Sequence, residues 1–258
     1  MARNLTLVRC SLVCRAWVSR AQMNLFYEIN ASILTESALE CLGYTLLHKP
    51  LLTQSIRHVF LDGFNLCARN GTVFLLALDK PQLRGCTIRH LFPRSNAPSA
   101  DSIGRYAYNS LTDVAQRIQP IRKLSLVECG IRDGRSLVNF LDSFQSLSLL
   151  LITWASPHPF TNQTFLPPSH PRHSHCQLLS LAIQIVPNAS TLLTFFVESG
   201  PLISYLKYLM VSCSFYNLTS LLQETGELLL HCSHSLQELT IVVGYFYEPN
   251  YTLEAGTP

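Results

Sequence analysis

A short stretch of imidazole and thiol side chains has the clearest potential for metal chemistry in this sequence. It lies in a Pro-rich segment and comprises His170, His173, His175 and Cys176. Histidine nitrogen and cysteine thiolate are ligands of structural zinc, usually as two short pairs from separate parts of the chain. A second pair is offered only by His231 with Cys232 or His234. The Pro-rich context favours a solvated loop over a zinc site, so we expect no bound metal.

The other residues of catalytic type form no known catalytic pattern. The sequence contains no Gly-x-Ser-x-Gly elbow, no His-Glu-x-x-His motif, no phosphate-binding Gly-rich loop and no dinucleotide fingerprint. Its 16 acidic residues are scattered, and helix-spaced pairs such as Glu36 with Glu40 are expected on solvated helix faces. We therefore predict no catalytic residues, no cofactor and no enzyme activity. A metal-dependent enzyme that uses the cluster ending at Cys176 is the alternative.

Composition narrows the class of protein further. The chain has 258 residues, of which 48% are hydrophobic and 14% charged, which excludes wholesale disorder. No apolar run approaches the ~20 residues of a membrane span, and a net charge of +3 is too balanced to favour nucleic acid. The nine cysteines include no Cys-x-x-Cys pair, and arginines interrupt the apolar runs near residue 1. Reduced thiols in the cytoplasm or nucleus are the expected state.

A recurring aliphatic pattern indicates the elements that must form the framework. The pattern is aliphatic-x-x-aliphatic-x-aliphatic, and its copies start between 26 and 38 residues apart. In chain order they begin at Ile56, Leu83 (a degenerate copy), Ile121, Leu147, Leu178, Leu206 and Leu236. The pattern alone arises by chance in so aliphatic a chain, so the near-even spacing carries the prediction. We predict a strand at each copy, with helical segments between them at 72–79, 111–118, 136–144, 190–198 and 218–230.

Strand–helix units of this length resemble an irregular leucine-rich repeat. The copy from Ile121 to Ile131 reproduces the family string L-x-x-L-x-L-x-x-C-x-L, with Cys129 at the polar position. The resemblance implies an α/β solenoid with parallel strands on a concave face and helices on the convex face. Outward strand residues would then recognise a protein substrate, although solvated strand residues are an equal alternative. The candidate substrate-binding residues are Arg57, Arg122, Lys123, Lys207, Tyr208 and Gln237.

The first 30 residues carry a second resemblance. They are rich in arginine, which is typical of a mitochondrial presequence or of a core helix with a basic wet face. The run CSLVCRAWVSRAQ at 10–22, followed by LFYEI at 25–29, is instead similar to the second half of an F-box of the fungal type. The usual Leu-Pro-x-Glu opening of that motif has no counterpart here, so the resemblance implies a truncated box. The residues that would contact a Skp-type adaptor protein are Leu12, Val13, Cys14, Trp17, Leu25 and Phe26.

Together these resemblances imply a substrate-recognition adaptor of a cullin–RING ubiquitin ligase. The expected organisation is a partial F-box-like helical segment at 1–30, a helical linker at 31–49, a leucine-rich-repeat-like domain at 50–247 and a flexible tail at 248–258. The implied partners are the Skp-type adaptor and a protein substrate, with no nucleic acid and no membrane, and the chain would be a monomer within a larger complex. A repeat scaffold without a ubiquitin role is the alternative, in which the partial box serves only as an N-terminal cap.

Overall fold

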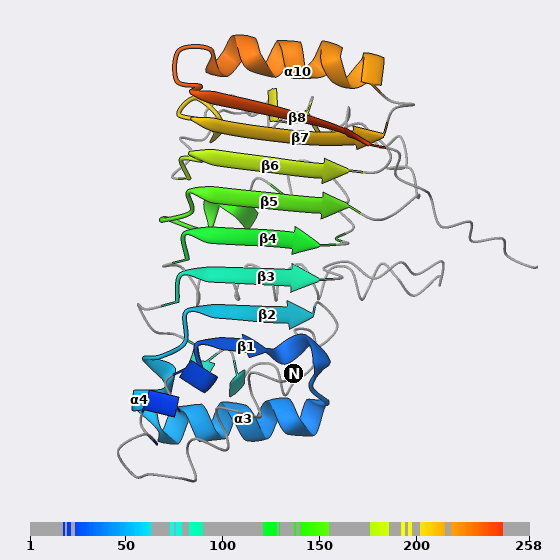
Figure 1. Ribbon diagram of the computed structural model, residues 1–258. Helices are drawn as coiled ribbons and strands as arrows, with labels where there is room; N and C mark the ends of the chain where they lie inside the picture. Colours follow the sequence, from blue (N-terminus) through cyan, green and yellow to red (C-terminus); the bar gives the residue numbers. More distant parts are fainter. Residues whose placement is uncertain are drawn as a thin grey trace, which may run out of the picture.

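The architecture is a single parallel sheet whose strands follow one another in chain order. The computed structural model describes residues 18, 20–21, 24–62, 73–74, 76–78, 83–89, 121–127, 129, 137, 140–154, 176–185, 192–193, 196–197, 202–214 and 218–244. Within them, eight strands pair in the order β1 to β8, and every pairing is parallel. Figure 1 shows the strands as one stack, with their N-terminal ends at the left. The predicted α/β fold with parallel strands is confirmed.

The elements have the following bounds. The strands are β1 Glu28–Asn30, β2 His58–Asp62, β3 Gly85–Arg89, β4 Lys123–Val127, β5 Leu149–Trp154, β6 Ser180–Ile185, β7 Tyr208–Ser214 and β8 Glu238–Gly244. The helices are the 3₁₀ turn η1 Ala31–Ile33, α3 Glu36–His48, α4 Pro50–Thr53 and α10 Leu218–Cys232. Figure 1 draws α3 below β1 and α10 above β8, so these helices lie at opposite ends of the stack.

Alternating strand residues build the core as two continuous ladders. The register aligns Ile29, Val59, Cys86, Leu124, Leu150, Leu181, Leu209 and Leu239 in the first ladder. The second ladder aligns Leu61, Ile88, Leu126, Ile152, Ile183, Val211 and Ile241. From β2 to β7 the members of both ladders are buried. Successive side chains of a strand point to opposite faces, so one face of the sheet is apolar and packed.

The aliphatic pattern located the strands correctly, and the sheet also begins earlier than predicted. Strands β2 to β8 lie at the seven predicted copies, including the degenerate copy that starts at Leu83. Residues 28–30, which the sequence assigned to a helical segment, form β1 instead. The reason is that Ile29 aligns with Val59 and extends the first ladder by one strand. The expected tail at 248–258 lies outside the described residues, and so do residues 1–17 of the expected helical segment at 1–30. The expected helical linker at 31–49 contains η1 and α3.

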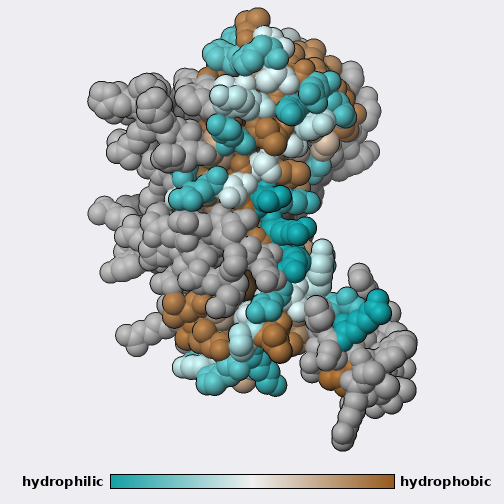
Figure 2. Space-filling view, turned by 90° about the vertical axis from the view of Figure 1, so that its left-hand side faces the viewer, coloured by the Kyte–Doolittle hydropathy of each residue, from teal (hydrophilic) through white to brown (hydrophobic). Residues whose placement is uncertain are grey.

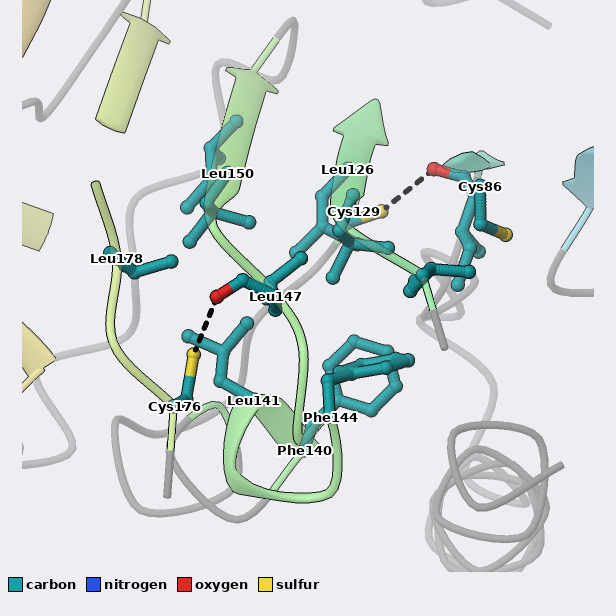
Figure 3. Close-up of a cluster of buried hydrophobic side chains, with 14 of the residues drawn as sticks. Cys86, Leu126, Cys129, Phe140, Leu141, Phe144, Leu147, Leu150, Cys176 and Leu178 are labelled. Atoms are coloured by element: carbon teal, nitrogen blue, oxygen red, sulfur yellow. Dashed lines mark hydrogen bonds between the residues drawn. The ribbon is translucent and has the colours of Figure 1, made fainter. Parts of the chain in front are cut away.

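Segments between the strands cover the packed face. Helical residues at 73–74, 76–77, 137, 140–142, 192–193 and 196–197 contribute Phe74, Phe140 and Phe196 to the same core cluster as the ladders. Figure 3 shows Phe140 and Phe144 packed beside Leu141 and Leu147 below the strands, and their rings meet edge to face at 5.1 Å. These residues fall within three of the predicted helical segments. The predicted helix at 111–118 lies outside the described residues.

The ends of the sheet are formed by α3 near β1 and by α10 and β8 at the other end. Thr35 is the N-cap of helix α3, and its hydroxyl oxygen accepts a hydrogen bond from the Ala38 amide. Helix α10 contacts β7. In β8 the ladder residue Leu239 is 39% exposed, whereas Leu209 in the preceding strand is 2% exposed. Strand β8 therefore forms the less covered edge of the described sheet.

Candidate functional site

The solvent-facing side of the sheet is the surface that the fold leaves available for recognition. Three rows of side chains cross it, one before the first core ladder, one between the two ladders and one after the second ladder. The row after the second ladder is Asp62, Arg89, Val127, Thr153, Gln184, Ser212 and Val242. The first outward row is Glu28, His58, Gly85, Lys123, Leu149, Ser180, Tyr208 and Glu238. The second outward row is Asn30, Phe60, Thr87, Ser125, Leu151, Ala182, Met210 and Thr240. The rows are mixed in chemistry, with polar groups over β2 to β4 and apolar groups at Leu149, Leu151 and Met210.

A separate set of residues, which we call the edge row, lies at the N-terminal ends of the strands. Its members each precede a first-row residue and are Tyr27, Arg57, Arg84, Arg122, Ser148, Leu179, Lys207 and Gln237. At each of the seven steps between strands, the carbonyl of one edge-row residue accepts bonds from two consecutive amides of the next strand, over 2.8–3.2 Å. For example, the Arg84 carbonyl accepts from the amides of Arg122 and Lys123. The connection geometry is therefore repeated from one strand to the next.

The candidate substrate-binding residues fall on two adjacent rows. Lys123 and Tyr208 lie in the first outward row, where the sequence placed them. Arg57, Arg122, Lys207 and Gln237 lie in the edge row and so border the outward face. All six remain candidates, and the register separates them into a group on β2 to β4 and a group on β7 and β8.

The sequence-based selection missed Arg84, which lies in the edge row between Arg57 and Arg122. Its position was readable, because a basic residue directly follows the first aliphatic residue in the copies that begin at Ile56, Leu83 and Ile121. The degenerate form of the second copy concealed this equivalence. Arg84 and Arg122 are exposed, whereas Arg57 is half-buried and its Nη1 donates to the carbonyls of Gln54 and Ile56.

A histidine lies across β3 on the outward face. The His58 Nε2 is 2.9 Å from the Thr87 hydroxyl, and its ring packs against Phe60 with centroids 4.7 Å apart. Gly85 makes this arrangement possible, because a Cβ there would collide with the His58 ring. Thr87 is consequently buried although it belongs to the outward face. The group therefore forms an ordered polar site on β2 and β3.

The environment of His58 lowers the pKa of its imidazole below the ordinary value of 6.5, mainly because the ring is partly buried. The carboxylate of Glu28 opposes this effect, and the ammonium of Lys123 adds to it. The neutral form is therefore favoured near neutral pH. Because the folded pKa lies below the unfolded one, the free energy of unfolding falls as pH drops below about 6.5.

We expect substitutions of the two charged neighbours to move the His58 pKa in opposite directions. Glu28→Gln removes the anion that favours the imidazolium and should lower the pKa further, whereas Lys123→Gln removes a cation and should raise it. An NMR titration of the imidazole signals measures both shifts, with His58→Gln used to assign the resonance. Shifts of the same sign in both variants would contradict this account.

Four of the described thiols, those of Cys86, Cys129, Cys176 and Cys232, belong to the core, whereas the Cys41 thiol is exposed. Cys129 donates from its Sγ to the carbonyls of Ile88 and Val127, over 3.5 and 3.4 Å, and so ties the end of β4 to the end of β3. Cys176 is fully buried and donates to the Leu147 carbonyl, as Figure 3 shows. Burial, together with the nearby Asp142 carboxylate, raises the pKa of the Cys176 thiol to about 12. The other members of that cluster, His170, His173 and His175, lie outside the described residues.

The candidate adaptor-binding residues are only partly described. Leu12, Val13, Cys14 and Trp17 lie outside the described residues. Leu25 is half-buried, and Phe26 is half-buried and packs against the core cluster. Phe26 therefore contributes to the sheet domain through part of its surface.

The described part of the chain contains no helix that is long and apolar enough to cross a membrane. It also contains no group of three or more His, Cys, Asp or Glu side chains that could hold a metal ion. Comparison with protein families, curated proteins and solved structures gives no match for this chain.

Proposed function

We propose that this chain is a non-catalytic, leucine-rich-repeat-like module that binds a protein partner. The observation that carries the proposal is the edge row, whose carbonyls repeat one bonding arrangement at seven successive steps. Such repetition produces a long exposed sheet face with regularly spaced side chains, which is the kind of surface that repeat proteins use for recognition. The Cys129 thiol supports the family assignment, because it bonds the carbonyl of the neighbouring strand, as the polar residue of such repeats is expected to do.

Within this proposal, the chain is the substrate-recognition adaptor of an SCF-type ubiquitin ligase. The support is the resemblance of residues 10–29 to an F-box, a motif that binds a Skp-type adaptor protein. The repeat module would then hold the substrate, and other subunits would supply catalysis by bringing the reacting groups together. The absence of a recognisable catalytic motif in the sequence agrees with such a division of labour.

A repeat scaffold without a ubiquitin role is the second candidate, and one observation favours it. Ile29 ends the F-box-like run, yet it is a buried member of the first core ladder. Phe26, three residues earlier, also packs against the core. A segment that closes the end of a repeat array must bury apolar side chains in this way, so the run can be interpreted as a cap.

The test is complex formation between the full chain and a purified Skp-type adaptor, followed by size-exclusion chromatography. The ligase proposal predicts co-elution at equal stoichiometry. Trp17→Ala combined with Leu12→Ala should abolish co-elution, because large apolar anchors dominate such interfaces. Circular dichroism of the double variant should retain the signal of the sheet.

The alternatives give different results in the same experiment. Absence of a complex with a folded wild-type chain contradicts the ligase proposal and leaves the scaffold. Loss of the circular-dichroism signal in the double variant would show that the two side chains are part of the core and contradict their assignment as adaptor-binding residues.

A further inference from the structure

Three arginines lie at the same level on three neighbouring strands. Arg57, Arg84 and Arg122 occupy consecutive positions of the edge row, linked carbonyl to amide from β2 to β4. Neighbouring strands are about 4.8 Å apart, so the three backbone positions span about 10 Å. Lys123 follows Arg122 directly and adds a fourth cation in the first outward row. Figure 2 faces this edge and shows a band of hydrophilic residues along it.

The described residues of β3 and β4, which carry Arg84 and Arg122 at their starts, include no acidic residue. The acidic residues of the strands are Glu28 in β1, Asp62 in β2 and Glu238 in β8, and none of the described edge-row residues is acidic. Arg84, Arg122 and Lys123 are exposed, and within the described residues their side chains take part in no ion pair or hydrogen bond. Arg57 donates from its Nη1 to the backbone carbonyls of Gln54 and Ile56, so Arg84 and Arg122 supply the two exposed guanidinium groups of the row.

We propose that the edge of β2 to β4 binds an acidic, extended segment of a protein partner, with carboxylates paired to Arg84 and Arg122. This inference rests on the proposed function, since it assumes that the repeat module binds a protein. Arginine is suited to the task, because its planar guanidinium pairs with a carboxylate through two parallel hydrogen bonds. Arg84 and Arg122 lie on neighbouring strands, about 4.8 Å apart. In an extended chain, side chains on one face recur at every second residue, about 6.7 Å apart, so the long arginine side chains can reach two such carboxylates.

Another basic residue of the edge row, Lys207, provides a control for the proposed binding. Lys207 occupies the edge row on β7, beyond the uncharged Ser148 and Leu179. Three strand spacings separate it from Arg122, which is about 14 Å. That distance exceeds the screening length of about 8 Å at physiological salt. Lys207 has the same backbone setting and charge sign as the arginines, but it should not contribute to the same binding event.

The experiment measures fluorescence anisotropy of the full chain with a fluorescein-labelled Gly-Asp-Gly-Asp-Gly peptide. Its two carboxylates lie about 6.7 Å apart along an extended chain, too close together to bridge the distance from Arg122 to Lys207. A matched peptide carries Asn in place of Asp, and a labelled oligothymidylate of equal length represents nucleic acid. The acidic peptide should bind at least about tenfold more tightly than the Asn peptide, and more tightly than the oligothymidylate. Arg84→Gln with Arg122→Gln should weaken its binding by about tenfold or more, whereas Lys207→Gln should change it by less than about twofold.

Three results would overturn the inference. They are equal binding of the acidic and Asn peptides, an equal loss with Lys207→Gln, and tighter binding of the oligothymidylate, which would make the row a nucleic-acid surface. Failure here is distinguishable from failure of the ligase proposal, because adaptor co-elution depends on residues 10–29 and not on the edge row. A chain that binds the adaptor but not the peptide contradicts this inference alone. A chain that binds the peptide but not the adaptor supports this inference and favours the repeat scaffold as its function.

Discussion

Leu150→Ala should lower the free energy of unfolding by about 2–5 kcal/mol. Leu150 is fully buried in β5, where the register places it between Leu124 of β4 and Leu181 of β6. Truncation leaves a cavity within the ladder, and the neighbours on both sides are held in register by backbone pairing, so they cannot close it. Domains are stable by only about 5–15 kcal/mol, and one such change therefore removes a large share of the total.

The neighbouring residue provides the control for this prediction. Leu149→Ala removes the same atoms from the same strand, but Leu149 faces outward and is only half-buried. We expect it to cost about 1 kcal/mol or less. Urea-induced unfolding of both variants, followed by circular dichroism, gives the comparison. Equal losses would mean that the outward face is packed as tightly as the core, contrary to the fold described above.

Two glycine-to-alanine substitutions in the terminal helices should have opposite signs. Gly43 lies in α3, where an added Cβ would be 2.8 Å from the Phe74 amide nitrogen and 3.0 Å from its Cα. Those atoms belong to the backbone, so the helix must move away, which typically costs about 1–3 kcal/mol. Gly226 lies in α10 with nothing within 4 Å of its added Cβ. Gly226→Ala should therefore stabilise the protein by about 0.5–1 kcal/mol through helix propensity.

Thermal unfolding of the two variants tests this contrast. Because the chemical change is identical and both residues are helical, any difference in sign reflects the close approach of α3 to residues 73–74. Stabilisation by both substitutions would show that the α3 contact relaxes without cost and would contradict the packing described here.

The strands were predictable because successive side chains of a strand point to opposite faces of the sheet. Where one face is packed, every second side chain must therefore be apolar. The pattern starting at Ile121 or Leu206 records this requirement directly, and even the degenerate copy at Leu83 retains Cys86 and Ile88 as ladder members. Strand β1 was missed because three residues are too few to display an alternation. Ile29 also follows an apolar run that has helical spacing, and only its pairing with Val59 reveals the strand.

The candidate surface was less predictable, because it depends on which residues become neighbours across strands. Arg57, Arg84 and Arg122 are separated in the chain by residues of very different character, and their alignment follows from the register. The contact between His58 and Thr87 depends in addition on the missing side chain of Gly85. The arginines leave one signal in the sequence, a basic residue after the first aliphatic residue of three successive copies, whereas the contact of His58 leaves none. The F-box-like run, by contrast, was recognised from the types of its residues and their order in the sequence. A binding experiment with the adaptor is needed to test it.

The chain-order pairing of the sheet has a consequence for how the molecule assembles. Each interior strand pairs only with its predecessor and its successor, so the contacts between strands join neighbouring units, and ordering can spread from one unit to the next. We expect the end units to unfold first, because each end strand pairs with only one other strand. With its exposed Leu239 and Val243, β8 should exchange its amide hydrogens earliest and the strands around β5 latest. A partner that spans several units would then hold neighbouring units closed together.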